Sequence, residues 1–408
     1  MMSSFNGLIL EYPLVSVDNF SGKSLQSTTY FLSHAHTDHM QGLTSKAFAN
    51  RLKNGHNCRV FSSECTRNIL RDGGDVFGVA DVVVKRLEVL PCDAAEVIEV
   101  VNHDGEVEYS LTVTTLQAGH CPGSVMFVFD GPNGRVLYTG DFRLYPGQSA
   151  NLVGLPACVK TVYLDTTFCF AGANKFPRRE EAIKSLCAIV KQWTMKNPAA
   201  PVFVNTKTRL GYEAVFVELE RTLRQKIHVS ERRHSMYKSM LELYDILTLD
   251  EAESNIHACD KCSVVLQAES ALWIKLCAFS FTLKHTNGRT TLKHPKFSHS
   301  YRVCFSMHSS FSEIAELVQH VKPRRIVPIA FPPGSDVLQI LNLLPKVVPK
   351  ESVRERTRPE QRLFEKNVNR IAASEDPCIG AASTSTDDLV FEDEIELPKP
   401  KRLKFRSF

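Results

Sequence analysis

The sequence lacks the features that would place the protein in a membrane or in the secretory pathway. It contains no apolar run near the roughly 20 residues that a membrane-spanning helix needs. Residues 1–20 lack the basic and apolar segments of a secretory signal. Cysteine is too sparse for a disulfide scaffold, at 12 in 408 residues. We therefore expect reduced thiols, some of them metal ligands, and no membrane partner.

Charge is low overall but unevenly distributed. The net charge is only +4 over 408 residues, which says little about partners. Two stretches are locally basic: residues 221–238 carry six Lys or Arg and one acid, and residues 284–302 carry five and no acid. Either stretch by itself could be an ordinary solvated surface, or it could bind phosphate groups. The length favours two compact units and a tail.

The patterning changes along the chain from strands to helices. Short strand-like runs separated by turns occur up to about residue 167, at residues 30–32, 124–129, 136–138 and 162–164. Helical periodicity then predicts helices over residues 178–193, 211–225 and 234–249, with a buried strand at 202–204. Two more strands are expected near 301–306 and 325–329. Between them, Ser310 and Glu313 have the spacing of a capping box, which begins a helix that ends before Pro323.

The C-terminal end differs in composition from the rest. Beyond about residue 349 the apolar periodicity fades, and residues 375–396 carry eight acids and no Lys or Arg. Residues 399–406 then carry five basic residues. We expect residues 350–408 to be mostly disordered. The basic cluster at 399–402 is compatible with nuclear import, and equally with a solvated basic end.

Four candidate metal ligands lie within six residues directly after a strand: His34, His36, Asp38 and His39. On an extended loop, His34 and His36 project to the same side and can reach one cation. Asp38 and His39 lie one step further along and can hold a second cation. A lone histidine is usually a surface or core residue, but this spacing after a strand favours a metal site.

Two later residues complete the expected site. His120 lies on a glycine-bounded turn before a strand, and Asp141 directly follows a strand. A carboxylate can bridge two cations about 3.5–4 Å apart, as in two-metal hydrolases. The full set is therefore His34, His36, His120 and Asp141 for one metal, and Asp38, His39 and Asp141 for the other.

This ligand order resembles that of the metallo-β-lactamase family. The resemblance implies an α/β fold, the αββα sandwich, with metals at the strand ends. Residues 1–350 also resemble the β-CASP branch, in which an α/β cap domain is inserted before the last part of the sandwich. We expect the metallo-β-lactamase domain at residues 1–168 and 301–349, the β-CASP cap at 169–300 and the disordered tail at 350–408.

Further family motifs can be compared one residue at a time. The motif A acid corresponds to Asp165 and the motif B histidine to His308. The motif C histidine of RNA-processing relatives is absent, because its place falls at Ile329 or Ala330. The resemblance then implies the DNA-directed branch and a second metal with one ligand fewer.

Within that branch, the sequence is similar to the end-processing nucleases of non-homologous end joining. Residues 2–5 and 11–13 resemble their N-terminus. The resemblance also implies a structural zinc site in the cap, formed by His228, His257, Cys259 and Cys277. Two imidazoles and two thiolates make a closed tetrahedral site, which would stabilise a small domain. Cys262 is a rival ligand because it forms a C-x-x-C pair with Cys259, and ordinary buried thiols are the other alternative.

The implied chemistry is hydrolysis of a phosphodiester, with Asp38, Asp141, Asp165 and His308 as catalytic residues. One or two Zn²⁺ ions, or Mg²⁺ or Mn²⁺ in the second position, would lower the pKa of a bound water. Asp165 would orient His308, whose charged ring could protonate the leaving oxygen; otherwise Asp165 is a structural acceptor. Phosphate-binding residues are expected directly after a buried strand, at Asn205, Thr206 and Lys207. The two basic stretches would form a groove for a phosphate backbone.

We therefore expect a metal-dependent DNA endonuclease, with 5′-exonuclease activity, that acts on hairpins, overhangs and single/double-strand junctions in double-strand break repair. The resemblance implies a nuclear protein whose partners are DNA, the DNA-dependent protein kinase catalytic subunit and the end-joining ligase complex. The alternatives are a 5′-exonuclease of crosslink or telomere processing, an RNA-processing β-CASP nuclease, a small-molecule hydrolase and a non-catalytic repair scaffold. The absent motif C histidine counts against RNA processing, and the cap counts against a small-molecule hydrolase.

Overall fold

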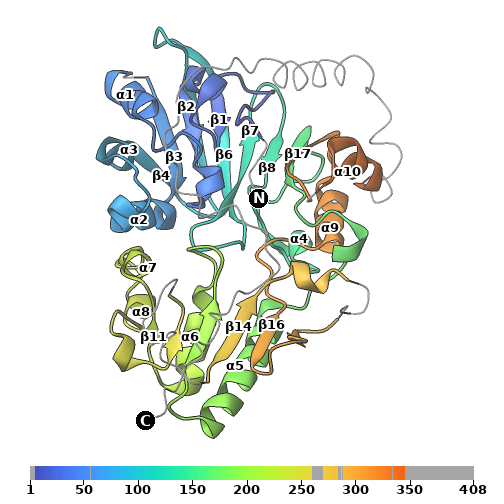
Figure 1. The fold of residues 1–408 in the computed structure, drawn as a ribbon. Coiled ribbons are helices and arrows are strands. Elements are labelled where there is room, and N and C mark those ends of the chain that lie inside the picture. The colour runs from blue at the N-terminus through green and yellow to red at the C-terminus, as the bar shows by residue number, and fades with distance from the viewer. Residues whose placement is uncertain are drawn as a thin grey trace, which may run out of the picture. The chain divides into compact units, whose positions relative to one another are not determined.

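The computed structural model describes residues 5–55, 57–259, 270–283, 286, 288–332 and 334–344. All of these residues lie within one compact unit, residues 1–353. Their strands form three sheets, which Figure 1 shows together with the helices beside them. Two of the sheets build the sandwich, and the third builds the cap.

The first sheet of the sandwich is parallel and has the order β1-β2-β3-β4. These strands are Val15–Val17, Thr29–Phe31, Arg59–Ser63 and Leu87–Leu90. The second sheet is mixed and has the order β17-β9-β8-β7-β6-β5. Its strands in chain order are β5 Ala95–Val101, β6 Val107–Gln117, β7 Val125–Asp130, β8 Val136–Tyr138, β9 Thr161–Asp165 and β17 Arg325–Ala330.

Helices cover the outer face of each sheet (Figure 1). The helices α1 (Lys46–Asn54), α2 (Glu64–Gly73) and α3 (Asp81–Arg86) pack beside the first sheet. The helices α9 (Phe311–Val321) and α10 (Val337–Leu343) pack beside the second sheet. Between the two sheets lies a core of buried side chains that includes Phe31, Phe61, Phe127 and Tyr163. This arrangement confirms the expected αββα sandwich.

The cap sheet has the order β12-β11-β13-β10-β14-β16-β15, and all of its described strand pairs are parallel except β15 with β16. Its main helices, α5 (Arg179–Lys196) and α6 (Glu213–Leu223), pack on one face through side chains such as Leu186 and Phe216. The strands in chain order are β10 Val202–Asn205, β11 Ile227–His228, β12 Leu247–Thr248, β13 Ile256–His257, β14 Leu272–Leu276, β15 Thr291–Lys293 and β16 Ser300–Val303.

The cap is an insertion into the second sheet of the sandwich. β17 pairs in parallel with β9, in a register that places Arg325 beside Thr161, although the whole cap separates them in sequence. The chain therefore leaves this sheet after β9, builds the cap and returns beside β9. Because β16 belongs to the cap sheet, the chain returns to the second sheet after Val303. The helix α9 then begins with the predicted capping box of Ser310 and Glu313.

One predicted helix is wrong. Residues 234–249 form the end of α7 (Glu231–Ser235), the short helix α8 (Leu241–Tyr244) and the strand β12. Tertiary contacts override the helical periodicity here: Tyr237 donates its hydroxyl hydrogen to Glu213, and the Ser239 amide donates to Asp72. The remaining short helical turns are η1 Gly22–Gln26, η2 Thr37–His39, η3 Gly74–Val76, α4 Gln148–Asn151, η4 Ala171–Ala173, η5 Glu251–Glu253 and η7 Phe279–Phe281. In the described ranges, no helix has the length and apolar character to cross a bilayer.

Candidate metal centre

The ends of several sandwich strands bring the predicted ligands together. The buried strand β2 ends at Phe31, and the following loop and the turn η2 carry His34, His36 and His39. In the second sheet, β6, β7, β8 and β9 are neighbours in that order. The loop between β6 and β7 carries His120, while Asp141 follows β8 and Asp165 ends β9. Side chains from four separate segments can therefore meet at one edge of the sandwich.

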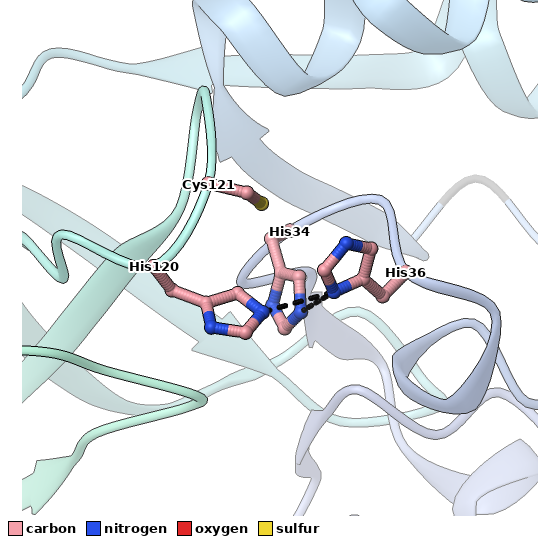
Figure 2. A group of neighbouring side chains, drawn as sticks. All are labelled: His34, His36, His120 and Cys121. Atoms are coloured by element: carbon pink, nitrogen blue, oxygen red, sulfur yellow. Dashed lines mark hydrogen bonds between the residues drawn. The ribbon is translucent and has the colours of Figure 1, made fainter. Parts of the chain in front are cut away.

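Three imidazoles converge on a single point (Figure 2). The Nδ1 atom of His36 lies 3.1 Å from Nε2 of His34 and 2.9 Å from Nε2 of His120. The Oδ2 atom of Asp141 lies 3.4 Å from Nε2 of His120 and 3.8 Å from Nε2 of His34. In a tetrahedral zinc site with Zn–N bonds near 2.1 Å, neighbouring ligand atoms are about 3.4 Å apart. The four side chains therefore fit one tetrahedral cation.

The partners of the opposite ring nitrogens show which nitrogen of each imidazole carries the proton. A carbonyl oxygen can only accept, so His36 donates from Nε2 to Leu210 (3.3 Å) and His120 donates from Nδ1 to Met307 (3.1 Å). Ser33 donates its hydroxyl hydrogen to Asp18, so its oxygen accepts from Nδ1 of His34 at 2.9 Å. The three nitrogens that face one another are therefore unprotonated in the neutral rings.

Burial keeps these rings neutral. It lowers the pKa of His34 and of His120 well below the ordinary value, and it also lowers the pKa of His36. Three lone pairs then face one another at hydrogen-bond distance with no proton between them. Such an arrangement is unfavourable unless a cation lies between the nitrogens, and neutral imidazole is the form that binds metals. Cys121 adds its side chain beside the same three rings (Figure 2), but burial raises the pKa of this thiol well above its ordinary value.

The second expected position has a different charge state. His39 lies with Nε2 3.2 Å from Oδ1 of Asp141 and with Nδ1 2.7 Å from Oδ2 of Asp18. Burial opposes a charged ring here, but the carboxylates of Asp141, Asp38 and Asp18 raise the pKa of His39 well above its ordinary value. In the metal-free protein, the charged ring of His39 therefore binds the Asp141 carboxylate, which is the contact that a second cation would make. A second cation bound at Nε2 must therefore replace a proton.

Asp38 and His308 lie on the open side of the site. The side chain of Asp38 is 31% exposed and its Oδ2 atom lies 4.0 Å from Nε2 of His39, whereas the side chain of His39 is only 2% exposed. The side chain of His308 is 22% exposed. These two side chains are therefore the most solvent-accessible of the expected catalytic-site residues.

Asp165 and His308 form a hydrogen-bonded pair. The Nδ1 atom of His308 lies 2.8 Å from Oδ2 of Asp165, and its Nε2 atom lies 3.8 Å from Oδ2 of Asp141. Burial opposes the charged ring, but Asp141 and Asp165 together raise the pKa of His308 to about 9. His308 is thus a cation at neutral pH and presents an N–H group beside the metal ligands. At the motif C position, Ile329 and Ala330 are buried and offer no ligand atom from their side chains.

The three residues expected to bind phosphate lie at the end of β10 in different environments. Asn205 and Lys207 are exposed, whereas Thr206 is buried. The hydroxyl of Thr206 accepts a hydrogen bond of 2.7 Å from Arg233. Asn205 and Lys207 are thus accessible to a ligand, and Thr206 has an internal partner.

In the cap, three of the four expected zinc ligands come together. His228, His257 and Cys259 place one ligand atom each within 4.8 Å of one another, and the Nδ1 atoms of the two histidines are 3.1 Å apart. Cys259 is disulfide-bonded, so its sulfur can ligate a metal only after reduction to the thiolate. The rival ligand Cys262 lies outside the described residues.

Cys277 is not brought into this group. It follows β14, and β10 lies between β14 and the strand β13 that carries His257. Cys277 therefore lies two strand positions from His257 along the sheet and is not among the ligand atoms that meet within 4.8 Å. The thiol of Cys277 instead accepts a hydrogen bond from Ser280.

The basic stretches contain exposed side chains, among them Arg224 and Arg232 of residues 221–238. Arg233 of the same stretch is buried and donates to the carbonyl oxygens of Ala258 and Thr208. Of residues 284–302, positions 284, 285 and 287 lie outside the description.

Several residues that surround the ligands belong to none of the predicted motifs. Asp18 accepts hydrogen bonds from the Ser33 amide (2.7 Å), the Ser33 hydroxyl (2.6 Å) and the Tyr138 hydroxyl (2.9 Å), in addition to its contact with His39. It follows the strand β1 directly, so an acid at a strand end was the available signal. The carbonyl of Leu210 gave no signal, because main-chain groups are the same at every position.

The comparisons with known proteins agree with this fold. The family described as "Beta-lactamase superfamily domain" matches residues 26–169, and "DNA repair metallo-beta-lactamase" matches residues 241–332. The chain is therefore a member of the metallo-β-lactamase superfamily that carries the DNA repair metallo-β-lactamase region. Among curated proteins, it is similar to "Protein artemis" of Mus musculus, with 33% identity over 99% of this chain, and of Homo sapiens, with 31% identity over 97%.

The similarity extends more weakly to a second kind of relative. The protein "5' exonuclease Apollo" of Mus musculus is 30% identical over 79% of this chain and 55% of its own length. The chain spans 57% of the mouse artemis protein and 58% of the human one. The similarity to the artemis proteins therefore includes both the sandwich and the cap, but only about half of their length.

Proposed function

We propose that this protein is a metal-dependent DNA nuclease that hydrolyses phosphodiester bonds at hairpins, overhangs and single/double-strand junctions, with 5′-exonuclease activity. The observation that carries the proposal is the meeting of three unprotonated ring nitrogens, from His34, His36 and His120, beside the carboxylate of Asp141. A buried donor set of this kind, open to solvent on one side, is typical of catalytic metal sites. The similarity to the artemis proteins supports DNA as the substrate.

Two groups of residues would hold the cations that hydrolysis uses. His34, His36, His120 and Asp141 would hold the first cation, and Asp38, His39 and Asp141 the second. The first cation would be Zn²⁺, because imidazole nitrogens suit zinc, whereas Zn²⁺, Mg²⁺ or Mn²⁺ fits the more oxygen-rich second position. Bound metal supplies a water of lowered pKa and neutralises charge on the scissile phosphate.

His308 would act as the general acid. Its ring is held by Asp165 through Nδ1, so the proton on Nε2 is free to pass to the leaving oxygen. The pKa of about 9 keeps this proton available at neutral pH in the metal-free protein. Asn205 and Lys207, exposed at the end of β10, would contact a flanking phosphate, while Thr206 would fix the loop that carries them.

A 5′-exonuclease is the second candidate, and the similarity to the Apollo protein favours it. An RNA-processing enzyme has less support, because the motif C position carries no ligand. A non-catalytic scaffold has less support as well, because every ligand of the first cation is present. The cap group of His228, His257 and Cys259 would bind a structural Zn²⁺ when Cys259 is reduced.

The cellular role would be the repair of double-strand breaks by non-homologous end joining in the nucleus. The DNA-dependent protein kinase catalytic subunit and the end-joining ligase complex would be its partners. These assignments follow from the similarity to artemis proteins of which this chain spans little more than half.

The proposal can be tested by a gel assay on end-labelled hairpins, overhangs, single strands and matched RNA. The wild-type chain should cut near hairpin tips or overhang junctions when zinc, magnesium or manganese is supplied. An Asp38→Asn/Asp141→Asn double variant should not cut, because both cations lose a carboxylate ligand. Stepwise loss of nucleotides from phosphorylated 5′ ends without any cut at hairpin tips or overhang junctions would favour the exonuclease, and cleavage of RNA alone would contradict the proposal.

A further inference from the structure

The first residue of the cap helix α5 reaches the two loops that carry His120 and His308. Arg179 donates from Nε to the carbonyl of Ser306 (2.9 Å). Its Nη2 atom donates to the carbonyls of His120 (3.2 Å) and Met307 (3.1 Å). One guanidinium thus binds three main-chain oxygens, all of them in these two loops and none in the cap sheet.

One of these carbonyls also sets the tautomer of a metal ligand. The oxygen of Met307 accepts from Nδ1 of His120 at 3.1 Å and from Arg179 at the same time. If this oxygen moved, His120 would lose the acceptor that keeps its Nε2 atom unprotonated and directed at the other imidazoles. Met307 also directly precedes His308, so the same bond limits the position of the general acid.

A second arginine strengthens the arrangement. Arg143, two residues after Asp141, donates from Nη1 to the carbonyl of Ser306 at 2.7 Å. Its Nε atom lies 3.8 Å from a carboxylate oxygen of Glu313 in α9. Two guanidinium groups therefore share the Ser306 carbonyl. Burial and the neighbouring Arg143 lower the pKa of Arg179 to about 10, so Arg179 remains a cation at neutral pH.

We propose that Arg179 is a positioning residue by which the cap maintains the first metal site. Through the carbonyls of His120 and Met307, it holds the His120 ring with Nε2 toward the metal and fixes the loop before His308. The cap thus contributes to metal affinity even in the absence of DNA. This inference rests on the proposed function, because it requires the His34, His36, His120 and Asp141 group to bind a metal.

The test compares zinc affinities of Arg179→Lys and Arg178→Ala chains without DNA. Zinc binding is followed by competition with a chromogenic chelator, and a His36→Ala chain identifies which binding step belongs to the first site. Arg179→Lys keeps the charge but loses the forked donor, so first-site affinity should fall about 10- to 100-fold. Arg178 is exposed, so its replacement should change the affinity less than twofold. Unfolding curves show whether each variant is folded.

The outcomes separate the inference from the proposed function. If His36→Ala binds as much zinc as the wild type, the proposed metal site itself is wrong. If His36→Ala loses a zinc ion but folded Arg179→Lys binds within twofold of the wild type, only the role of Arg179 is wrong. If Arg179→Lys does not fold, the test uses the wild-type chain and the NMR signal of the Arg179 Nε–H group. Zinc should slow the exchange of this hydrogen with solvent, and an unchanged exchange rate would overturn the proposal.

Discussion

Asp18 shows how one buried carboxylate can organise two metal ligands. It accepts directly from His39, and through the Ser33 hydroxyl it fixes the proton of His34. We expect Asp18→Asn to weaken metal binding about 10- to 100-fold, because the amide NH₂ cannot accept and would face donors. Metal content after dialysis against a graded chelator series measures this effect.

Tyr138→Phe is the graded control for that prediction. It removes one of the donors to Asp18 and leaves the contacts with Ser33 and His39. Its metal affinity should lie between those of the wild type and Asp18→Asn. An Asp18→Asn chain that retains metal like the wild type would show that the two histidines are positioned by other groups.

His308 gives a pH dependence that can be worked out for the metal-free chain. Its pKa is about 9 in the fold and about 6.5 when unfolded, so the folded state holds the proton more tightly. Its contribution to stability is therefore complete below pH 6.5 and is lost as the pH rises through 9. The difference in free energy of unfolding between wild type and His308→Gln should shrink from pH 6 to pH 9.5 in urea titrations with chelator.

Asp165→Asn serves as the check on the cause of that shift. It removes a carboxylate that raises the pKa of His308. In an Asp165→Asn background, the effect of His308→Gln should change less with pH than in the wild type. An equal pH dependence in both backgrounds would assign the shift to Asp141 and Asp38.

At the scale of elements, the loop between β10 and α6 connects the cap to the metal ligands. Leu210 accepts from His36, and the next residue, Gly211, has a φ of +105° that favours glycine. A Cβ atom at Gly211 would lie only 2.0 Å from Sδ of Met307, so the loop that carries Gly211 and the loop that carries Met307 would have to move apart. Gly211→Ala should lower the free energy of unfolding by about 1–3 kcal/mol and weaken zinc binding at the first site.

The matched control is Gly78→Ala. Gly78 also has a positive φ, +64°, but a Cβ atom there meets nothing within 4 Å. Its replacement should cost about 1 kcal/mol from the backbone alone and leave zinc affinity unchanged. Urea unfolding and chelator competition on both variants measure the two effects. Equal zinc affinities in both variants would mean that the Leu210 carbonyl does not matter to His36.

Sequence patterns predicted correctly those helices and strands whose formation depends mainly on residues close together in the sequence. The capping box of Ser310 and Glu313 and the buried strand at 202–204 depend on neighbouring residues, and both are present. The helix predicted over residues 234–249 failed because Tyr237 and Ser239 bond to residues far away in sequence. The strand β14 was not predicted at all. Its alternation of buried and half-buried side chains reflects its place beside β10 and β16.

For the whole molecule, the insertion of the cap between β9 and β17 explains which residues of the site could be predicted from the sequence. The candidate ligands of the first cation all lie in one continuous piece, residues 34–141, at strand ends. The contributions of Leu210, Arg179 and the Met307 carbonyl come from distant segments through main-chain atoms or through a side chain that no motif marks. Geometry alone joins these groups, so composition and spacing could not reveal them.

The whole chain should bind structural zinc in the cap separately from the catalytic metal. His228, His257 and Cys259 offer three ligands, and Cys277 is separated from them by the strand β10. The fourth ligand would be Cys277 or its rival Cys262. Under reducing conditions, Cys259→Ser should lose one zinc ion per chain, and so should whichever of Cys277→Ser and Cys262→Ser removes the fourth ligand.

Atomic emission on chelator-washed protein counts the zinc, and urea unfolding reports the stability of the cap. A His36→Ala chain should lose first-site metal and keep the cap ion, which shows that the two sites fill independently. Loss of zinc from Cys277→Ser would assign the fourth position to Cys277, and loss from Cys262→Ser would assign it to Cys262. If Cys259→Ser retains all of its zinc, the cap cysteines are ordinary thiols, and the stability of the cap then depends on packing beneath α5 and α6 alone.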